Sequence, residues 1–188
     1  MMTYSAAIEK HLTQIWSQPL ERIRVSRGPI HELPVDFHVL VMHRLPEFLV
    51  YATRCMSQPS DKVRLELFVF TRNEFEGDPK DGLGLAELLT AVAHYHRTGA
   101  HLGLHHTVNF GQPWLEGSEC EHGLLSLPYL DPDVEWLEQE EMETRFLWLI
   151  PITTSELEFK KQRGVEALEQ QFEEAEFDFA DPFRSSVV

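Results

Sequence analysis

The chain has 188 residues, of which 43% are hydrophobic and two are cysteines. This apolar content is enough for one core without disulfide or metal staples, and so few cysteines exclude a disulfide framework and indicate a reducing compartment. The net charge of −15 argues against nucleic-acid binding, which depends on Lys and Arg side chains that neutralise phosphates. The sequence has neither the pattern of a secretory signal nor a long apolar run, so we expect a cytoplasmic protein without membrane contact.

The first third of the chain predicts one helix followed by three strands. Apolar residues recur at helical spacing over residues 5–16, with Ser5 as the N-cap, and Pro19 ends the helix. Strands are expected at 37–43, 48–54 and 63–71. The first and third of them are apolar on both faces, which is typical of central strands that are covered on two sides.

The middle of the chain predicts a second helix and two short strands. A glycine-rich loop at 77–84 leads into a helix over 85–97, which Gly99 closes. Shorter extended segments are expected at 107–110 and 124–129.

The last part predicts the most apolar strand and a broken helical region. A polar connector runs to Glu143, and the strand is expected at 145–152. Thr153 and Glu156 form the pattern of a capping box, which opens a helix that Gly164 interrupts.

The order of the elements predicts an α+β fold in which helices pack on a mixed, largely antiparallel sheet. We find no repeat and no low-complexity linker, so we expect a single domain over residues 1–188. Its core would lie at about 35–175, followed by an acidic and aromatic tail at 176–188. In this tail, Arg184 is expected to pair locally with an aspartate.

A series of short motifs runs through the chain in a fixed order. They are Arg64–Phe68 with its pair Glu66 and Leu67, the helix residues Glu87, Leu88, Leu89, Ala93 and Tyr95 with Gly99, then His106 with Thr107, then Ser118, Leu124, Leu125 and Pro128, then Thr154–Leu157 with Glu156 and Gly164, and last Arg184. This ordered set resembles the suppressor of fused domain, a family of interaction domains. The resemblance implies mainly structural roles for these residues.

The resemblance implies protein binding without catalysis and without a cofactor. The animal member has two domains and clamps a peptide of a transcription factor, partly by adding it as a β-strand, which an exposed sheet edge permits. This chain resembles the short bacterial form, and His105 stands where animal members tend to have Asp before His106. Bacterial members are thought to include immunity proteins that neutralise a cognate toxin.

The charge distribution favours a basic partner. Residues 1–115 have 12 acidic and 11 basic side chains, whereas residues 116–188 have 19 acidic and 5 basic ones. Such a field would attract a basic toxin domain and speed the encounter, although acidic surfaces also serve solubility. The partner-binding candidates are Glu135, Trp136, Glu138, Glu140 and Glu141, together with His105 and His106.

Catalytic alternatives have weaker support. The cluster from His94 to His106 contains five histidines, but no C-x-x-C or H-E-x-x-H motif accompanies it, so we expect no metal site. Ser118 lies outside a nucleophile elbow, and the flanking glutamates would raise the pKa of Cys120. We therefore predict an immunity-type binding protein, with a strand-adding peptide adaptor as the alternative and a metal-dependent enzyme as a third possibility. A homo-oligomer is compatible with all three.

Overall fold

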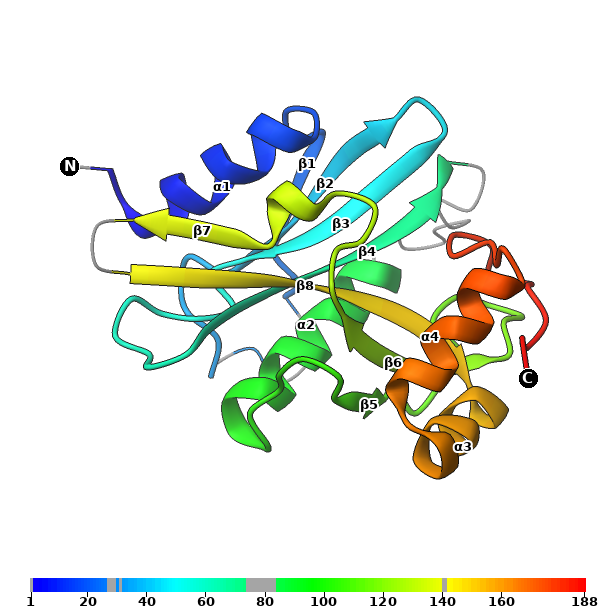
Figure 1. Ribbon diagram of the computed structural model, residues 1–188. Coiled ribbons are helices and arrows are strands. Elements are labelled where there is room, and N and C mark those ends of the chain that lie inside the picture. Colours follow the sequence, from blue (N-terminus) through cyan, green and yellow to red (C-terminus); the bar gives the residue numbers. More distant parts are fainter. Residues whose placement is uncertain (1, 27–29, 31, 74–83, 140–141) are drawn as a thin grey trace.

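The computed structural model describes residues 2–26, 30, 32–73, 84–139 and 142–188 (Figure 1). The expected loop at 77–84 lies outside these residues except for Gly84. The elements are α1 (Tyr4–Ile15), β1 (Glu21–Ile23), β2 (His38–Leu45), β3 (Phe48–Arg54), β4 (Arg64–Arg72), α2 (Gly84–Thr98), β5 (Thr107–Asn109), β6 (Cys120–Ser126), the 3-10 helix η2 (Pro132–Val134), β7 (Trp136–Gln139), β8 (Met142–Thr153), α3 (Thr154–Arg163) and α4 (Val165–Glu174).

One mixed sheet organises the described residues. Its strand order is β1-β2-β3-β4-β8-β6-β5, with β7 also paired to β8. Only the pair β4–β8 is parallel, and the other pairs are antiparallel. Because β4 occupies one edge of β8, β7 and β6 share the other edge, where they pair with its first and second halves. The predicted α+β fold with a mixed, largely antiparallel sheet is confirmed.

Helices cover both faces of the sheet, which explains the doubly apolar strands. On one face α2 packs over a core that includes Leu67, Leu89 and Leu149, and on the other α1 and α4 pack over Phe68 and Phe146. The seven central residues of β4 are all buried. Central strands of this kind show runs of apolar residues because each face meets a helix.

The predicted capping box and helix break are confirmed. The Thr153 hydroxyl accepts from the Glu156 N–H, and the Glu156 carboxylate accepts from the Thr153 N–H. Gly164 has a φ of +94°, a conformation that favours glycine, and separates α3 from α4. The first helix is capped by Thr3 rather than by the expected Ser5.

Two strands were not predicted. β1 and β7 lie in segments that were expected to be connectors. β1 is short and mostly exposed, and β7 alternates exposed with half-buried residues, so neither has the apolar run of a central strand. β7 also extends β8 back to Met142, three residues before the expected start. No helix in the described parts of the chain has the length and apolarity needed to cross a membrane.

Candidate functional site

A groove lies between α2 and β5, the last strand in the order of the sheet. Its volume is about 240 Å³. The lining residues are Leu88, Ala91, Val92 and Tyr95 from α2 and Thr107, Val108, Asn109 and Phe110 from β5 and its end. Tyr95 is 43% exposed although it is large and aromatic. The groove is therefore mainly apolar and has an aromatic side chain at its opening.

The outer edge of β5 offers backbone groups beside this groove. β5 stands last in the strand order, and its described pairing is with β6 alone. The Phe110 N–H donates to Glu121 O at 3.0 Å, so Phe110 and Val108, two residues earlier, direct their backbone groups toward β6. Backbone direction alternates along an antiparallel strand. The N–H and C=O groups of Thr107 and Asn109 therefore point to the open edge.

Two local features fix β5 and the floor of the groove. His105, just before β5, has a φ of +65°, and its carbonyl accepts from Lys160 Nζ at 2.7 Å. Gly123 of β6 leaves room for neighbouring side chains, since a Cβ there would lie 2.7 Å from Phe110 Cζ and 2.6 Å from Leu149 Cδ1. The absence of a side chain at this position thus lets the Phe110 ring lie over β6 beneath the groove.

The acidic candidates lie elsewhere, on β7 and around its pairing with β8. Glu135 is neutralised by Arg145, whose Nη2 lies 2.7 Å from the carboxylate and whose guanidinium carbon lies 5.0 Å from the Trp136 ring centroid. Trp136 is 46% exposed. Glu138 pairs directly across the strands with Glu143, so two like charges face each other. Candidates Glu140 and Glu141 lie outside the described residues.

The described binding candidates lie on or beside different strands of the sheet. His105 and His106 lie at the start of β5, beyond β6, whereas Trp136 and Glu138 lie on the strand that pairs with the first half of β8. The groove itself was not predicted from the sequence. Its signal is present in Ala91 and Tyr95, which lie four residues apart on the exposed face of α2.

Comparison with known proteins identifies the family. The family model described as suppressor of fused protein (SUFU) matches residues 33–185. This chain belongs to the SUFU family. The crystal structure of a SUFU homolog from Neisseria gonorrhoeae FA 1090 is similar with a TM-score of 0.80 and 31% identity, and the match covers 98% of this chain and 97% of that one.

More distant SUFU structures share the fold. A chain of the Sufu–Fu complex matches with a TM-score of 0.70 and 15% identity, over 98% of this chain and 92% of that one. Drosophila Suppressor of Fused matches with a TM-score of 0.64 and 16% identity, over 96% of this chain but 50% of that one. This chain thus spans half of the Drosophila protein. No curated protein matches the sequence.

Several residues of the SUFU motifs form buried polar contacts. Glu66 is fully buried and accepts from the Thr53 hydroxyl at 2.7 Å and the Met56 N–H at 3.0 Å. Ser118 accepts from Trp114 Nε1 at 3.0 Å. These contacts fix the β3–β4 connection and the turn before β6, consistent with structural roles. Tyr95 differs, because its exposed ring packs against Gly99 at the end of α2.

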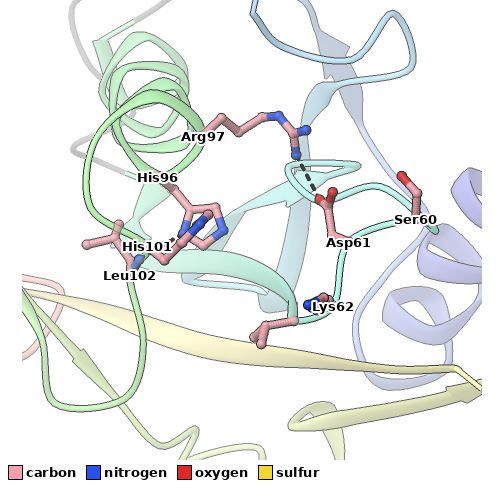
Figure 2. A pocket seen from close by; sticks show the side chains of 8 residues that line it. Ser60, Asp61, Lys62, His96, Arg97, His101 and Leu102 are labelled. Atoms are coloured by element: carbon pink, nitrogen blue, oxygen red, sulfur yellow. Dashed lines mark hydrogen bonds and ion pairs between the residues drawn. The ribbon is translucent and has the colours of Figure 1, made fainter.

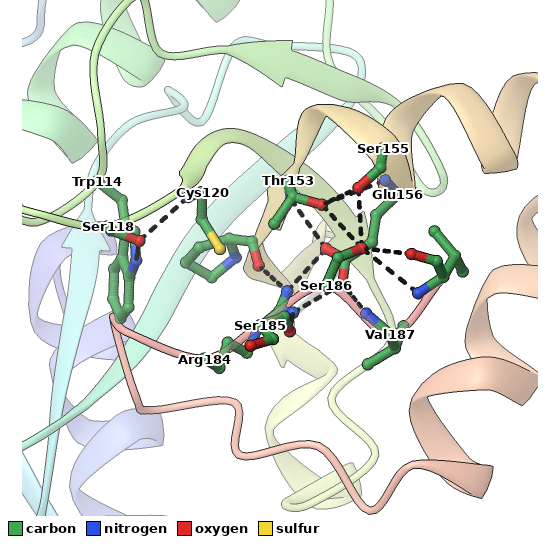
Figure 3. Close-up of polar contacts among 12 residues, drawn as sticks. Trp114, Ser118, Cys120, Thr153, Ser155, Glu156, Arg184, Ser185, Ser186 and Val187 are labelled. Atoms are coloured by element: carbon green, nitrogen blue, oxygen red, sulfur yellow. Dashed lines mark hydrogen bonds and ion pairs between the residues drawn. The ribbon is translucent and has the colours of Figure 1, made fainter.

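The C-terminal segment is fastened by a buried ion pair (Figure 3). Arg184 donates to both carboxylate oxygens of Glu156, at 2.7 and 2.8 Å, and to Pro151 O at 2.9 Å. The expected local pair with an aspartate is wrong, since Asp178 instead pairs with Arg72. The distant pairing arises because the helix cap buries Glu156, and this carboxylate requires a counter-charge.

Among the described residues, no three His, Cys, Asp or Glu side chains converge as metal ligands would. Cys55 and Cys120 are buried and free, and burial is the main cause that raises the pKa of the Cys120 thiol. The exposed His106 imidazole makes no hydrogen bond within the described parts of the chain.

Proposed function

We propose that this protein is a non-catalytic binding domain that holds an extended segment of a partner protein along the outer edge of β5. The observation that carries the proposal is the open edge next to the apolar groove. An added strand would bond to the outward backbone groups of Thr107 and Asn109, while an alternate side chain entered the groove beside Tyr95. The structural likeness to a chain of the Sufu–Fu complex supports a binding role.

A proline at Thr107 tests this proposal directly. Proline removes an N–H that points outward and leaves the bonds to β6 in place. Peptides selected from a random display library on the immobilised protein would serve as probes. We expect Thr107→Pro to weaken their binding by at least ten-fold, whereas Thr107→Ala, which keeps the N–H, should bind within two- to three-fold of the wild type.

Thermal unfolding of both variants shows whether the fold survives. If Thr107→Ala and Thr107→Pro lost binding equally, the contribution of Thr107 to peptide binding would come from its side chain, and strand addition would be contradicted. Unchanged binding in a folded Thr107→Pro variant would exclude this edge as the site.

A second proposal is an immunity-type protein that occludes a basic toxin with its acidic surface. It is supported by the facing pair of Glu138 and Glu143 beside the exposed ring of Trp136. Like charges opposite one another weaken a strand pair, and a cationic partner would relieve this cost. The two proposals use separate surfaces, so variants can distinguish them.

Salt dependence separates the two modes. Partners captured from the source lysate would be tested against wild type and a Glu138→Lys/Glu143→Lys variant. Under the toxin proposal we expect slower association and a shallower salt dependence, because electrostatic steering is lost. If the association rate and its salt dependence were both unchanged, the acidic residues would be a solvated surface that does not contribute to binding.

A further inference from the structure

A second and larger cavity lies at the C-terminal end of α2 (Figure 2). Its volume is about 580 Å³, within the range of small-molecule sites. The β3–β4 connection supplies Ser60, Asp61, Lys62 and Val63, and the end of α2 with the following segment supplies His96, Arg97, His101 and Leu102. It is distinct from the groove beside β5 and shares no lining residue with it.

His96 presents a hydrogen-bond donor at this cavity. The residue is 4% exposed, and its Nδ1 accepts from the Leu102 N–H at 2.9 Å. Burial, followed by the charges of His101 and Arg97, lowers the pKa of His96 to about 4, so the ring is neutral near pH 7. With Nδ1 occupied as an acceptor, the proton of the neutral ring resides on Nε2. The same arrangement disfavours a metal ion, which needs an unprotonated nitrogen.

The charged side chains leave an excess of positive charge at the cavity. Asp61 is already satisfied, since its Oδ2 accepts from Arg97 Nη1 at 2.9 Å and from the Gln58 N–H at 2.8 Å. Burial would raise the pKa of Asp61, but these two donors outweigh it and hold the carboxylate ionised. Lys62 has no ion-pair partner among the described residues. His101 adds a second ring 5.5 Å from that of His96.

Donors and apolar walls together define the class of ligand. The exposed Lys62, together with Arg97 and the Nε2–H of His96, supplies donors that an anionic group can accept from, and Leu102 supplies apolar contact, with the 71% exposed Val63 at the rim. Two cations and one satisfied carboxylate stand out in a chain whose net charge is −15. With neutral histidines, the lining residues carry a formal net charge of +1, which is opposite in sign to that of the whole chain.

We infer that this cavity binds a small anion, a carboxylate or a phosphate, carried on a compact apolar body. The anionic group would lie among Lys62, Arg97 and His96, with the body against Leu102. This site does not depend on the partner-binding proposal, because it uses neither β5 nor β7.

Two probes test the inference at constant ionic strength. Sodium benzoate and sodium phosphate would be titrated, with sodium chloride as compensation, while NMR follows the Leu102 amide that reports on His96. We expect a saturable shift with at least one probe. Binding by benzoate would assign a carboxylate with an apolar body, and binding by phosphate alone would assign a phosphate.

Variants determine whether the anion that causes the shift binds in this cavity. Lys62→Gln/His101→Gln leaves the Arg97–Asp61 pair intact and should raise the dissociation constant about ten-fold. Lys161→Gln, which loses an exposed ion pair with Glu158, is the matched control and should bind as the wild type does. No saturable shift with either probe, or equal affinity in the double variant, would overturn the inference.

Discussion

Two fully buried glutamates, Glu66 and Glu156, show how surroundings decide the charge of the same residue type. Burial raises the pKa of Glu66 to about 7, although Thr53 and two backbone N–H groups donate to it. Burial acts on Glu156 in the same direction, but the hydrogen bonds and charge of Arg184 outweigh it and lower the pKa. A buried carboxylate with a cation stays charged, and one without a cation takes up a proton more readily.

Glu66 should make stability depend on pH. The folded protein binds its proton more tightly than the unfolded chain, whose glutamate titrates near pH 4.5, so this contribution is complete below pH 4.5 and is lost as pH rises to about 7. Urea unfolding of wild type and Glu66→Gln between pH 5 and pH 8 isolates the effect. We expect the difference in stability to shift in favour of the Gln variant as pH rises. A difference that stays constant would contradict the raised pKa.

Removing Arg184 should be strongly destabilising. Arg184→Ala would leave the Glu156 carboxylate buried without its counter-charge, at a cost of about 3–5 kcal/mol. Lys161→Ala, which removes an exposed pair, should cost less than about 1 kcal/mol. Chemical denaturation measures both. A similar small loss in the two variants would show that the buried pair does not fasten the C-terminal segment.

Among the helices and strands, sequence patterns predicted most of the features that have a local cause, although not the cap of the first helix at Thr3. The central strands, the capping box at Thr153 and the break at Gly164 follow from apolar runs and side-chain chemistry within a few residues. β7 could not be found, because it has only four residues, of which Glu138 and Gln139 are polar, and its pairing with β8 is tertiary. The groove depends on α2 and β5 meeting in space, and the Arg184–Glu156 pair joins residues 28 positions apart.

Gly123 should be essential to the floor of the groove. In Gly123→Ala, the new Cβ would displace Phe110 and Leu149, and we expect a loss of about 1–3 kcal/mol together with weaker binding of the selected peptides. Gly84→Ala is the control, because a Cβ there meets no described atom within 4 Å, and the change should be neutral or slightly stabilising. If Gly123→Ala kept the stability and the peptide binding of the wild type, neither property would depend on the present position of Phe110.

For the molecule as a whole, the charge is divided unequally along the sequence, with a net charge of −1 over residues 1–115 and −14 over residues 116–188. The acidic segment, residues 116–188, includes β6, β7, β8, α3 and α4. In the part of it that the structure describes, ion pairs neutralise five carboxylates, those of Asp131, Glu135, Glu156, Glu158 and Asp178. The facing glutamates on β7 and β8 remain a local source of repulsion.

Reversing one of these charges should stabilise the isolated protein. Glu138→Lys converts a repulsive cross-strand pair with Glu143 into an attractive one, which is worth about 0.2–1 kcal/mol. The gain should shrink in high salt because the site is exposed. Thermal unfolding at low and high salt measures it. A loss of stability at low salt would show that Glu138 has a favourable contact.

Amide hydrogen exchange at β5, with and without a selected peptide, tests strand addition most directly. The N–H groups of Thr107 and Asn109 point outward, so they should exchange fast in the free protein and at least ten-fold more slowly in the complex. The Val108 N–H is bonded to β6 and should be protected in both states. This alternation along three residues is the predicted result. Unchanged exchange at Thr107 and Asn109 in the saturated complex would contradict binding along β5.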